Sequence, residues 1–159
     1  MSVVRQITAK TGCDPTLMEL ELTESMIMGN DDKVDETLRV LSDLGFSVSI
    51  DDFGTGYSNL AYIQRYPVNC LKIDRSFVAD LTTNSAITEL IISMCHLIEA
   101  KIVAEGVETE EQLAWLRKKG CHEYQGYLFS PPVALDQFAR LLVERSSARL
   151  QRTQAVQRK

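Results

Sequence analysis

Short apolar or alternating segments are interleaved with longer segments in which apolar residues recur at helical spacing. The short segments predict five strands, at 18–23, 46–50, 70–74, 102–105 and, more weakly, 122–125. The longer segments predict helices at 2–10, 32–44, 58–65, 85–100, 110–119 and 136–149. Strand–helix–strand repetition at this spacing predicts βαβ units and a parallel sheet.

Residues with special backbone or capping properties mark several of the predicted helix ends. Gly45 and Gly120 stand immediately before a predicted strand, where a glycine can end the preceding helix. Candidate N-caps are Asn84, Thr109 and Asp136.

The predicted strands have two different faces. In the strand at 70–74, Leu71 and Ile73 point to one side, while Lys72 and Asp74 point to the other. The first two strands show the same alternation. An apolar face suits covering helices, and a small or polar face suits the interior of a (β/α) barrel. We therefore expect an α/β fold, a partial (β/α) barrel with about five βα units.

Composition narrows the classes of protein to consider. The chain has 159 residues, of which 45% are apolar and 25% charged, as in one soluble globular domain. The formal charge of −5 argues against a nucleic-acid polymer or a membrane surface as partner. Four scattered cysteines without a C-x-x-C pair predict reduced thiols and a cytoplasmic location. No apolar run is long enough to predict a membrane-spanning segment.

Polar residues follow every predicted strand at its carboxyl end. They are Glu21 and Glu24, Asp51 and Asp52, Lys72 and Asp74, Glu105 and Glu108, and Gln125. Parallel α/β barrels place their active sites at this end of the sheet. The repetition over five consecutive units therefore predicts one shared site.

Carboxylates that converge in one place repel each other unless a cation neutralises them. Oxygen ligands favour a hard cation, Mg²⁺ or Mn²⁺, and the adjacent Asp51 and Asp52 suit two ions, which would lie about 3.5–4 Å apart. Lys72 would orient a water molecule or stabilise negative charge on a phosphate. Two alternatives stay open from the residues alone: Asp51 and Asp52 as a turn before Gly54, and Glu24 as a loop anchor instead of a ligand.

Five motifs occur in an order that resembles EAL domains, the bacterial phosphodiesterases that linearise cyclic di-GMP. They are Glu-Leu-Thr-Glu-Ser at 21–25, Asp-Asp-Phe-Gly-Thr-Gly-Tyr-Ser at 51–58, Leu-Lys-Ile-Asp at 71–74, Ala-Glu-Gly-Val-Glu-Thr at 104–109 and Gln-Gly-Tyr-Leu-Phe at 125–129. The resemblance covers residues 2–142. It implies a modified (β/α)₈ barrel, cyclic di-GMP as substrate and linear 5′-pGpG as product.

The resemblance also implies roles for individual residues in a two-metal phosphodiesterase mechanism. Glu21 and Asp51 would bind the first ion, and Asp51 with Asp52 the second. Lys72 would hold the hydrolytic water. Glu108 would act as the base or help to fix the water and the second ion.

Other implied roles concern the substrate and the assembly. Glu24 would anchor the glycine loop, whose role in the family is to join metal binding to dimerisation, so a homodimer through the 52–60 region is expected. Asp74 and Gln125 correspond to positions on the substrate side.

The sequence departs from the family pattern in two places. The Glu-Ala-Leu tripeptide, whose glutamate is a metal ligand in the family, is absent, and so is a later asparagine ligand. We therefore expect residues 1–142 to be the C-terminal portion of an EAL domain, with its first strands missing. Residues 143–159 are then a basic helix end or tail.

Two alternative functions remain at this stage. One is a non-catalytic remnant that binds the nucleotide or a partner protein. The other is a different metal-dependent barrel enzyme that abstracts a proton, against which the 51–58 motif argues.

Overall fold

The computed structural model describes residues 2–27, 32–55, 63, 65–81, 83 and 85–144. Contacts divide the chain into two compact units, Met1–Phe129 and Ser130–Lys159. The first unit contains the sheet and all the predicted site residues. In the second unit residues 135–144 are helical, and the rest of the predicted basic tail lies outside the described residues.

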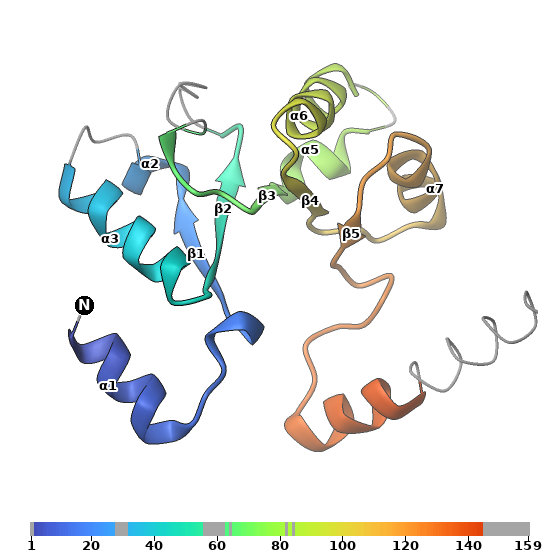
Figure 1. Ribbon diagram of the computed structural model, residues 1–159. Helices are drawn as coiled ribbons and strands as arrows, with labels where there is room; N and C mark the ends of the chain where they lie inside the picture. Colours follow the sequence, from blue (N-terminus) through green and yellow to red (C-terminus); the bar gives the residue numbers. More distant parts are fainter. Residues whose placement is uncertain are drawn as a thin grey trace, which may run out of the picture. The chain divides into compact units, whose positions relative to one another are not determined.

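Strands and helices alternate along the first unit (Figure 1). Its strands are β1 Glu19–Thr23, β2 Ser47–Phe53, β3 Cys70–Ile73, β4 Lys101–Ala104 and β5 Glu123–Tyr124. Its helices are α1 Ser2–Thr11, the short 3₁₀ helix η1 Pro15–Leu17, α2 Glu24–Ile27, α3 Asp32–Asp43, α5 Arg75–Ala79, α6 Ala86–Leu97 and α7 Glu110–Lys118.

The five strands form one parallel sheet in the order β1-β2-β3-β4-β5. All five predicted strands and the α/β fold class are therefore confirmed. The register pairs Glu21 with Ser49 and Lys72 with Val103. Parallel pairing brings the carboxyl ends of all five strands to one edge of the sheet.

Several predicted boundaries are corrected. The second strand continues through Asp51 and Asp52 to Phe53 instead of ending at residue 50. Asp74 is not a strand residue, because its side chain caps α5 by accepting a hydrogen bond from the N–H of Ser76. Asp136 is not an N-cap, because residue 135 is already helical.

Three short helices of the structure were not predicted from the sequence. They are η1, α2 and α5, whose three to five residues carry too little periodicity to be recognised. The N-cap of α6 is Ser85 and not the predicted Asn84, which itself lies outside the described residues. Most of the predicted helix at 58–65 also lies outside them.

Three helices end in the same hydrogen-bond motif, in which a left-handed residue follows the last turn. After α3 this residue is Gly45 (φ 97°), after α7 it is Gly120 (φ 83°), and after α6 it is Glu99 (φ 57°). In each case the next residue donates its N–H to a carbonyl five positions earlier, as Ala100 does to Cys95 over 3.0 Å. The glycine ends predicted at Gly45 and Gly120 are confirmed.

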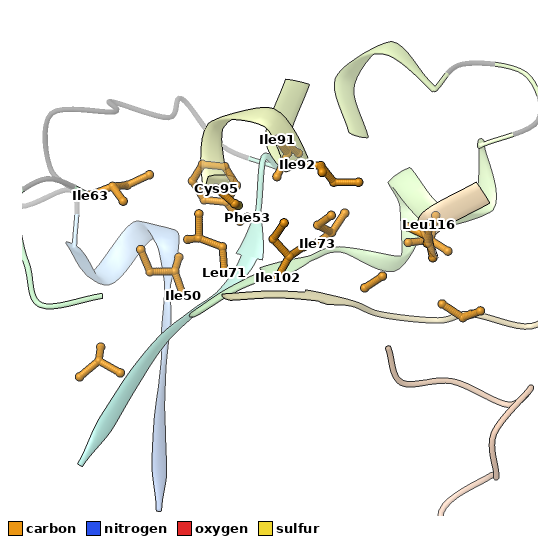
Figure 2. Packing of buried hydrophobic residues seen from close by; sticks show 14 of the residues in the cluster. Ile50, Phe53, Ile63, Leu71, Ile73, Ile91, Ile92, Cys95, Ile102 and Leu116 are labelled. Atoms are coloured by element: carbon orange, nitrogen blue, oxygen red, sulfur yellow. The ribbon is translucent and has the colours of Figure 1, made fainter. Parts of the chain in front are cut away.

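The hydrophobic core lies between one face of the sheet and the helices that cover it (Figure 2). Leu71 and Ile73 of β3 and Leu116 of α7 are fully buried there, and Ile91 of α6 is buried beside them. The predicted apolar face is thus confirmed. Burial extends to part of the opposite face, since Lys72 is only 6% exposed.

Candidate active site

Lys72 lies at the centre of a group of acids from neighbouring strands. Its Nζ is 2.9 Å from Glu21 Oε1, 3.0 Å from Asp51 Oδ1 and 2.7 Å from Glu105 Oε1. Glu21 comes from β1, Asp51 from β2, and Glu105 follows β4 directly. The predicted convergence of strand-end residues is therefore present around this lysine.

The charges in this group shift each other's protonation. Burial by itself would lower the pKa of Lys72, but the contacts with Glu105, Glu21 and Asp51 outweigh it, and the pKa is raised. Burial raises the pKa of Glu105, and Lys72 only partly offsets that effect. Lys72 therefore stays an ammonium group at neutral pH. Three carboxylates around one ammonium leave an excess of negative charge.

A bulge in β2 brings two consecutive aspartates into the same group. Successive side chains of a regular strand point to opposite faces. Here the pairing of β2 with β3 shifts between Ile50 and Phe53, and Asp52 has a left-handed backbone with φ 54°. A carboxylate oxygen of Asp51, one of Asp52 and one of Glu105 consequently lie within 4.8 Å of one another.

The chemistry of these donors fits a hard divalent cation. All three groups offer carboxylate oxygens, which Mg²⁺ and Mn²⁺ prefer. Among the residues that the structure describes, the buried Asp51 Oδ1 has no hydrogen-bond partner of good geometry, and it forms an ion pair with Lys72. A buried carboxylate oxygen that lacks a hydrogen bond is a suitable metal ligand.

Gln125 holds Glu105 in this group. Its side-chain Nε2–H donates to Glu105 Oε1 over 2.7 Å, and its backbone N–H donates to Ala104 over 2.9 Å. The sequence predicts Glu105 as one of the strand-end acids but indicates no separate role for it. The register of β4 against β3 indicates that Glu105 faces Lys72. Val103 pairs with Lys72, and Glu105 follows two positions later, on the same face of the sheet.

Glu24 lies beside the site and contacts the glycine loop. It is 6% exposed, and its Oε2 accepts a hydrogen bond from the N–H of Gly54 over 3.2 Å. Gly54 itself packs closely on Phe77 and Ile91. Residues 56–60, which belong to the predicted dimerisation region, lie outside the described residues, so that contact remains a prediction.

Two other predicted residues lie outside the acidic group. Asp74 accepts hydrogen bonds from the backbone N–H and the hydroxyl of Ser76. Burial opposes these bonds, yet the pKa of Asp74 is lowered. Glu108 is exposed, and its backbone N–H donates to Gln112 Oε1 over 2.8 Å.

Three of the four thiols are poor candidates for nucleophiles. All four cysteines are free, as the sequence predicted. Burial raises the pKa of Cys70 and of Cys95 to about 12, and that of Cys121 to about 11. Since the thiolate is the reactive form, these three side chains are inert at neutral pH.

Comparisons with known proteins agree with this geometry. The family model described as the EAL domain matches residues 1–132. The chain is 47% identical over 143 residues to the cyclic di-GMP phosphodiesterase NbdA of Pseudomonas aeruginosa, an alignment that covers 86% of this chain and 18% of NbdA.

Solved structures of cyclic di-GMP complexes are also similar to this chain. A structure of the PaMucR phosphodiesterase in complex with cyclic di-GMP matches with a TM-score of 0.80 and 42% identity, over 85% of this chain and 56% of that one. A manganese and cyclic di-GMP complex of Klebsiella pneumoniae BlrP1 matches with a TM-score of 0.74 and 33% identity, over 82% of this chain and 34% of that one.

Two further facts bear on the whole protein. The chain spans about a fifth or less of the length of the curated relatives it matches. Among the described residues, no helix combines the length and the apolar character that crossing a membrane requires.

Proposed function

The chain belongs to the EAL domain family, and we propose that it hydrolyses cyclic di-GMP to linear 5′-pGpG at the acidic group around Lys72. The observation that carries this proposal is the cluster of Asp51, Asp52 and Glu105 at the carboxyl edge of the sheet, beside a buried lysine. The relatives named phosphodiesterases, and the cyclic di-GMP complexes among the similar structures, support this substrate.

Asp51, Asp52 and Glu105, with Glu21 next to them, would hold the divalent cations, which we propose to be two Mg²⁺ or Mn²⁺ ions. Such ions lower the pKa of a bound water and neutralise charge on a phosphodiester. The bulge in β2 gives Asp51 and Asp52 a shared direction, so the two carboxylates can serve neighbouring positions.

Lys72 contributes a fixed positive charge. Its raised pKa keeps the ammonium protonated, so it donates hydrogen bonds and does not accept a proton. In this position it holds a water molecule by donation and stabilises negative charge that develops on the phosphate. Its contact with three acids from different strands fixes the ammonium without the need for a mobile side chain.

The base that accepts a proton from water has two candidates. The resemblance assigns this role to Glu108, while the contacts favour Glu105, which is held by Lys72 and Gln125 and has a raised pKa. Glu105→Gln and Glu108→Gln separate them, because only the base variant loses the acidic limb of the pH–rate profile, where the rate rises as the base is deprotonated.

The proposed function is tested by incubating the purified chain with cyclic di-GMP and Mn²⁺ and separating the products by chromatography. We expect linear 5′-pGpG, and at least a hundredfold loss of its formation in Asp51→Asn. Asp80→Asn, at the exposed end of α5, is the matched control and should keep its activity. Equal activity of the parent and Asp51→Asn would overturn the proposal.

A second candidate, left open by the sequence, is a non-catalytic module that binds the nucleotide. Isothermal titration with cyclic di-GMP distinguishes the two. Measurable binding without any linear product would support the non-catalytic module.

A further inference from the structure

The segment from Glu105 to Thr109 carries one of the acids of the site, yet it is not part of a strand or helix. Two backbone hydrogen bonds attach its first part to β3 and to the residue that follows β5. The N–H of Glu105 donates to Ile73 over 3.1 Å, and the N–H of Val107 donates to Gln125 over 3.1 Å. Beyond Val107 the chain leaves the sheet and turns into α7.

Gln112, in the first turn of α7, holds the second part of this segment. Its Oε1 accepts hydrogen bonds from the N–H of Glu108 over 2.8 Å and of Thr109 over 3.0 Å. Its Nε2–H donates to the carbonyl of Val78 over 3.2 Å. A capping box requires only the bond with Thr109, the N-cap residue. The bonds to Glu108 and Val78 are additional and reach outside α7.

The bond to Val78 connects this segment with the element that follows Lys72. Val78 belongs to α5, and α5 begins directly after the strand that carries Lys72. Lys72 lies a few residues before Val78, and Glu105 lies a few residues before Gln112. The bond between Gln112 and Val78 therefore joins the two chain segments that carry Lys72 and Glu105. We propose that Gln112 is a positioning residue, which holds the Glu105–Thr109 segment against α5 so that the Glu105 carboxylate stays in contact with Lys72.

The packing of the segment agrees with this role. A Cβ at Gly106 would lie 2.6 Å from the Cβ of Arg75, the first residue of α5, so the segment and α5 are in close contact near Glu105. Gln112 is the second link between the same two segments. Together, the bond to Val78 and the contact of Gly106 with Arg75 hold the backbone near Glu105 against α5.

The test uses the full chain without metal or substrate and measures backbone hydrogen exchange by NMR. Gln112→Met removes all three side-chain hydrogen bonds, and the shorter Gln112→Asn cannot span them. We expect exchange about tenfold faster at Glu108 and Thr109 and also at Glu105 and Val107, whose own bonds are intact. Gln112→Glu keeps the acceptor for Glu108 and Thr109 but cannot donate to Val78, so exchange at Glu105 should stay accelerated, as in Gln112→Met.

Thr109→Ala is the matched control, because it removes the Oγ1 that accepts from the N–H of Gln112 and leaves the bonds to Glu108 and Val78. Exchange at Glu105 should stay within about threefold of the parent in this variant. Equal acceleration by Thr109→Ala and Gln112→Met would reduce Gln112 to a helix cap and overturn the proposal. Unchanged exchange at Glu105 in both Gln112→Met and Gln112→Asn would also overturn it.

The consequence for catalysis rests on the proposed function. In a chain that forms 5′-pGpG, Gln112→Met should lower kcat about 10–100-fold with a smaller change in KM. A parent chain without turnover would contradict the proposed function and would leave the exchange result at Glu105 to decide on Gln112.

Discussion

Replacing Lys72 by methionine tests whether this ammonium holds the strand ends together. Methionine keeps the apolar length of the side chain and removes only the charge and its hydrogen bonds. The control is Lys101→Met on the neighbouring strand β4, where Lys101 pairs with Glu123. Both lysines have an acidic partner, but their surroundings differ.

The expected magnitudes follow from exposure. The Lys72 side chain is 7% exposed and contacts three acids, whose side chains are 51%, 26% and 16% exposed. Removing one partner of a buried ion pair costs about 3–5 kcal/mol. Water reaches Glu21 and, in part, Asp51, so we expect Lys72→Met to lower the free energy of unfolding by about 2–4 kcal/mol. Lys101 and Glu123 are 66% and 59% exposed and 3.6 Å apart, so Lys101→Met should cost at most about 0.5 kcal/mol.

The assay is urea denaturation followed by circular dichroism, with EDTA present so that stray cations cannot replace the missing charge. The difference between the two variants is the decisive quantity. If Lys72→Met loses no more stability than Lys101→Met, the three contacts of Lys72 contribute nothing beyond a surface ion pair. The description of the site as a buried, charge-compensated group would then be wrong.

Two further predictions concern local structure. Glu99→Gly should raise the free energy of unfolding by about 0.5–1 kcal/mol, because Glu99 has a left-handed backbone after α6. Gly120→Ala should lower it by about 1 kcal/mol, because Gly120 is also left-handed. Thermal unfolding measures both changes, and changes of the same sign would contradict this explanation. Asp74→Ala should cost about 1 kcal/mol at pH 7 through loss of the α5 cap. Because the pKa of Asp74 is lowered in the folded state, this difference should be present above the ordinary pKa of 3.8 and disappear as the pH falls below it; denaturation at a series of pH values is the measurement, and a difference that persists at low pH would contradict it.

The sequence predicted the sheet well because its signals are local. Each strand has a recognisable alternation or apolar run, and the glycines at 45 and 120 mark the ends of α3 and α7. The capping box of α7 was predicted in part, as Thr109 was identified, since its partner Gln112 lies three residues away. Parallel order then followed from the alternation of strands and helices.

The site was predicted as a set of residues but not as a geometry. Asp51 and Asp52 suggested either ligands or a turn, because adjacent polar residues before a glycine fit both. The structure has them in a strand, and a bulge that no local pattern indicates points both carboxylates into one group. A bulge depends on how β2 meets β3, and that pairing is a property of two segments twenty residues apart.

The sequence also could not show which of Glu105 and Glu108 joins the charged group. They stand three residues apart in one motif, so their spacing does not decide which of them faces Lys72. The decision comes from the register of β4 against β3, which pairs Val103 with Lys72 and so places Glu105 on the face of the ammonium. The turn at Gly106 then carries Glu108 out of that face and toward Gln112. One pairing between two four-residue strands thus determines which glutamate joins the charged group, and measuring the two glutamine variants against Lys72→Met would show whether catalysis follows that register.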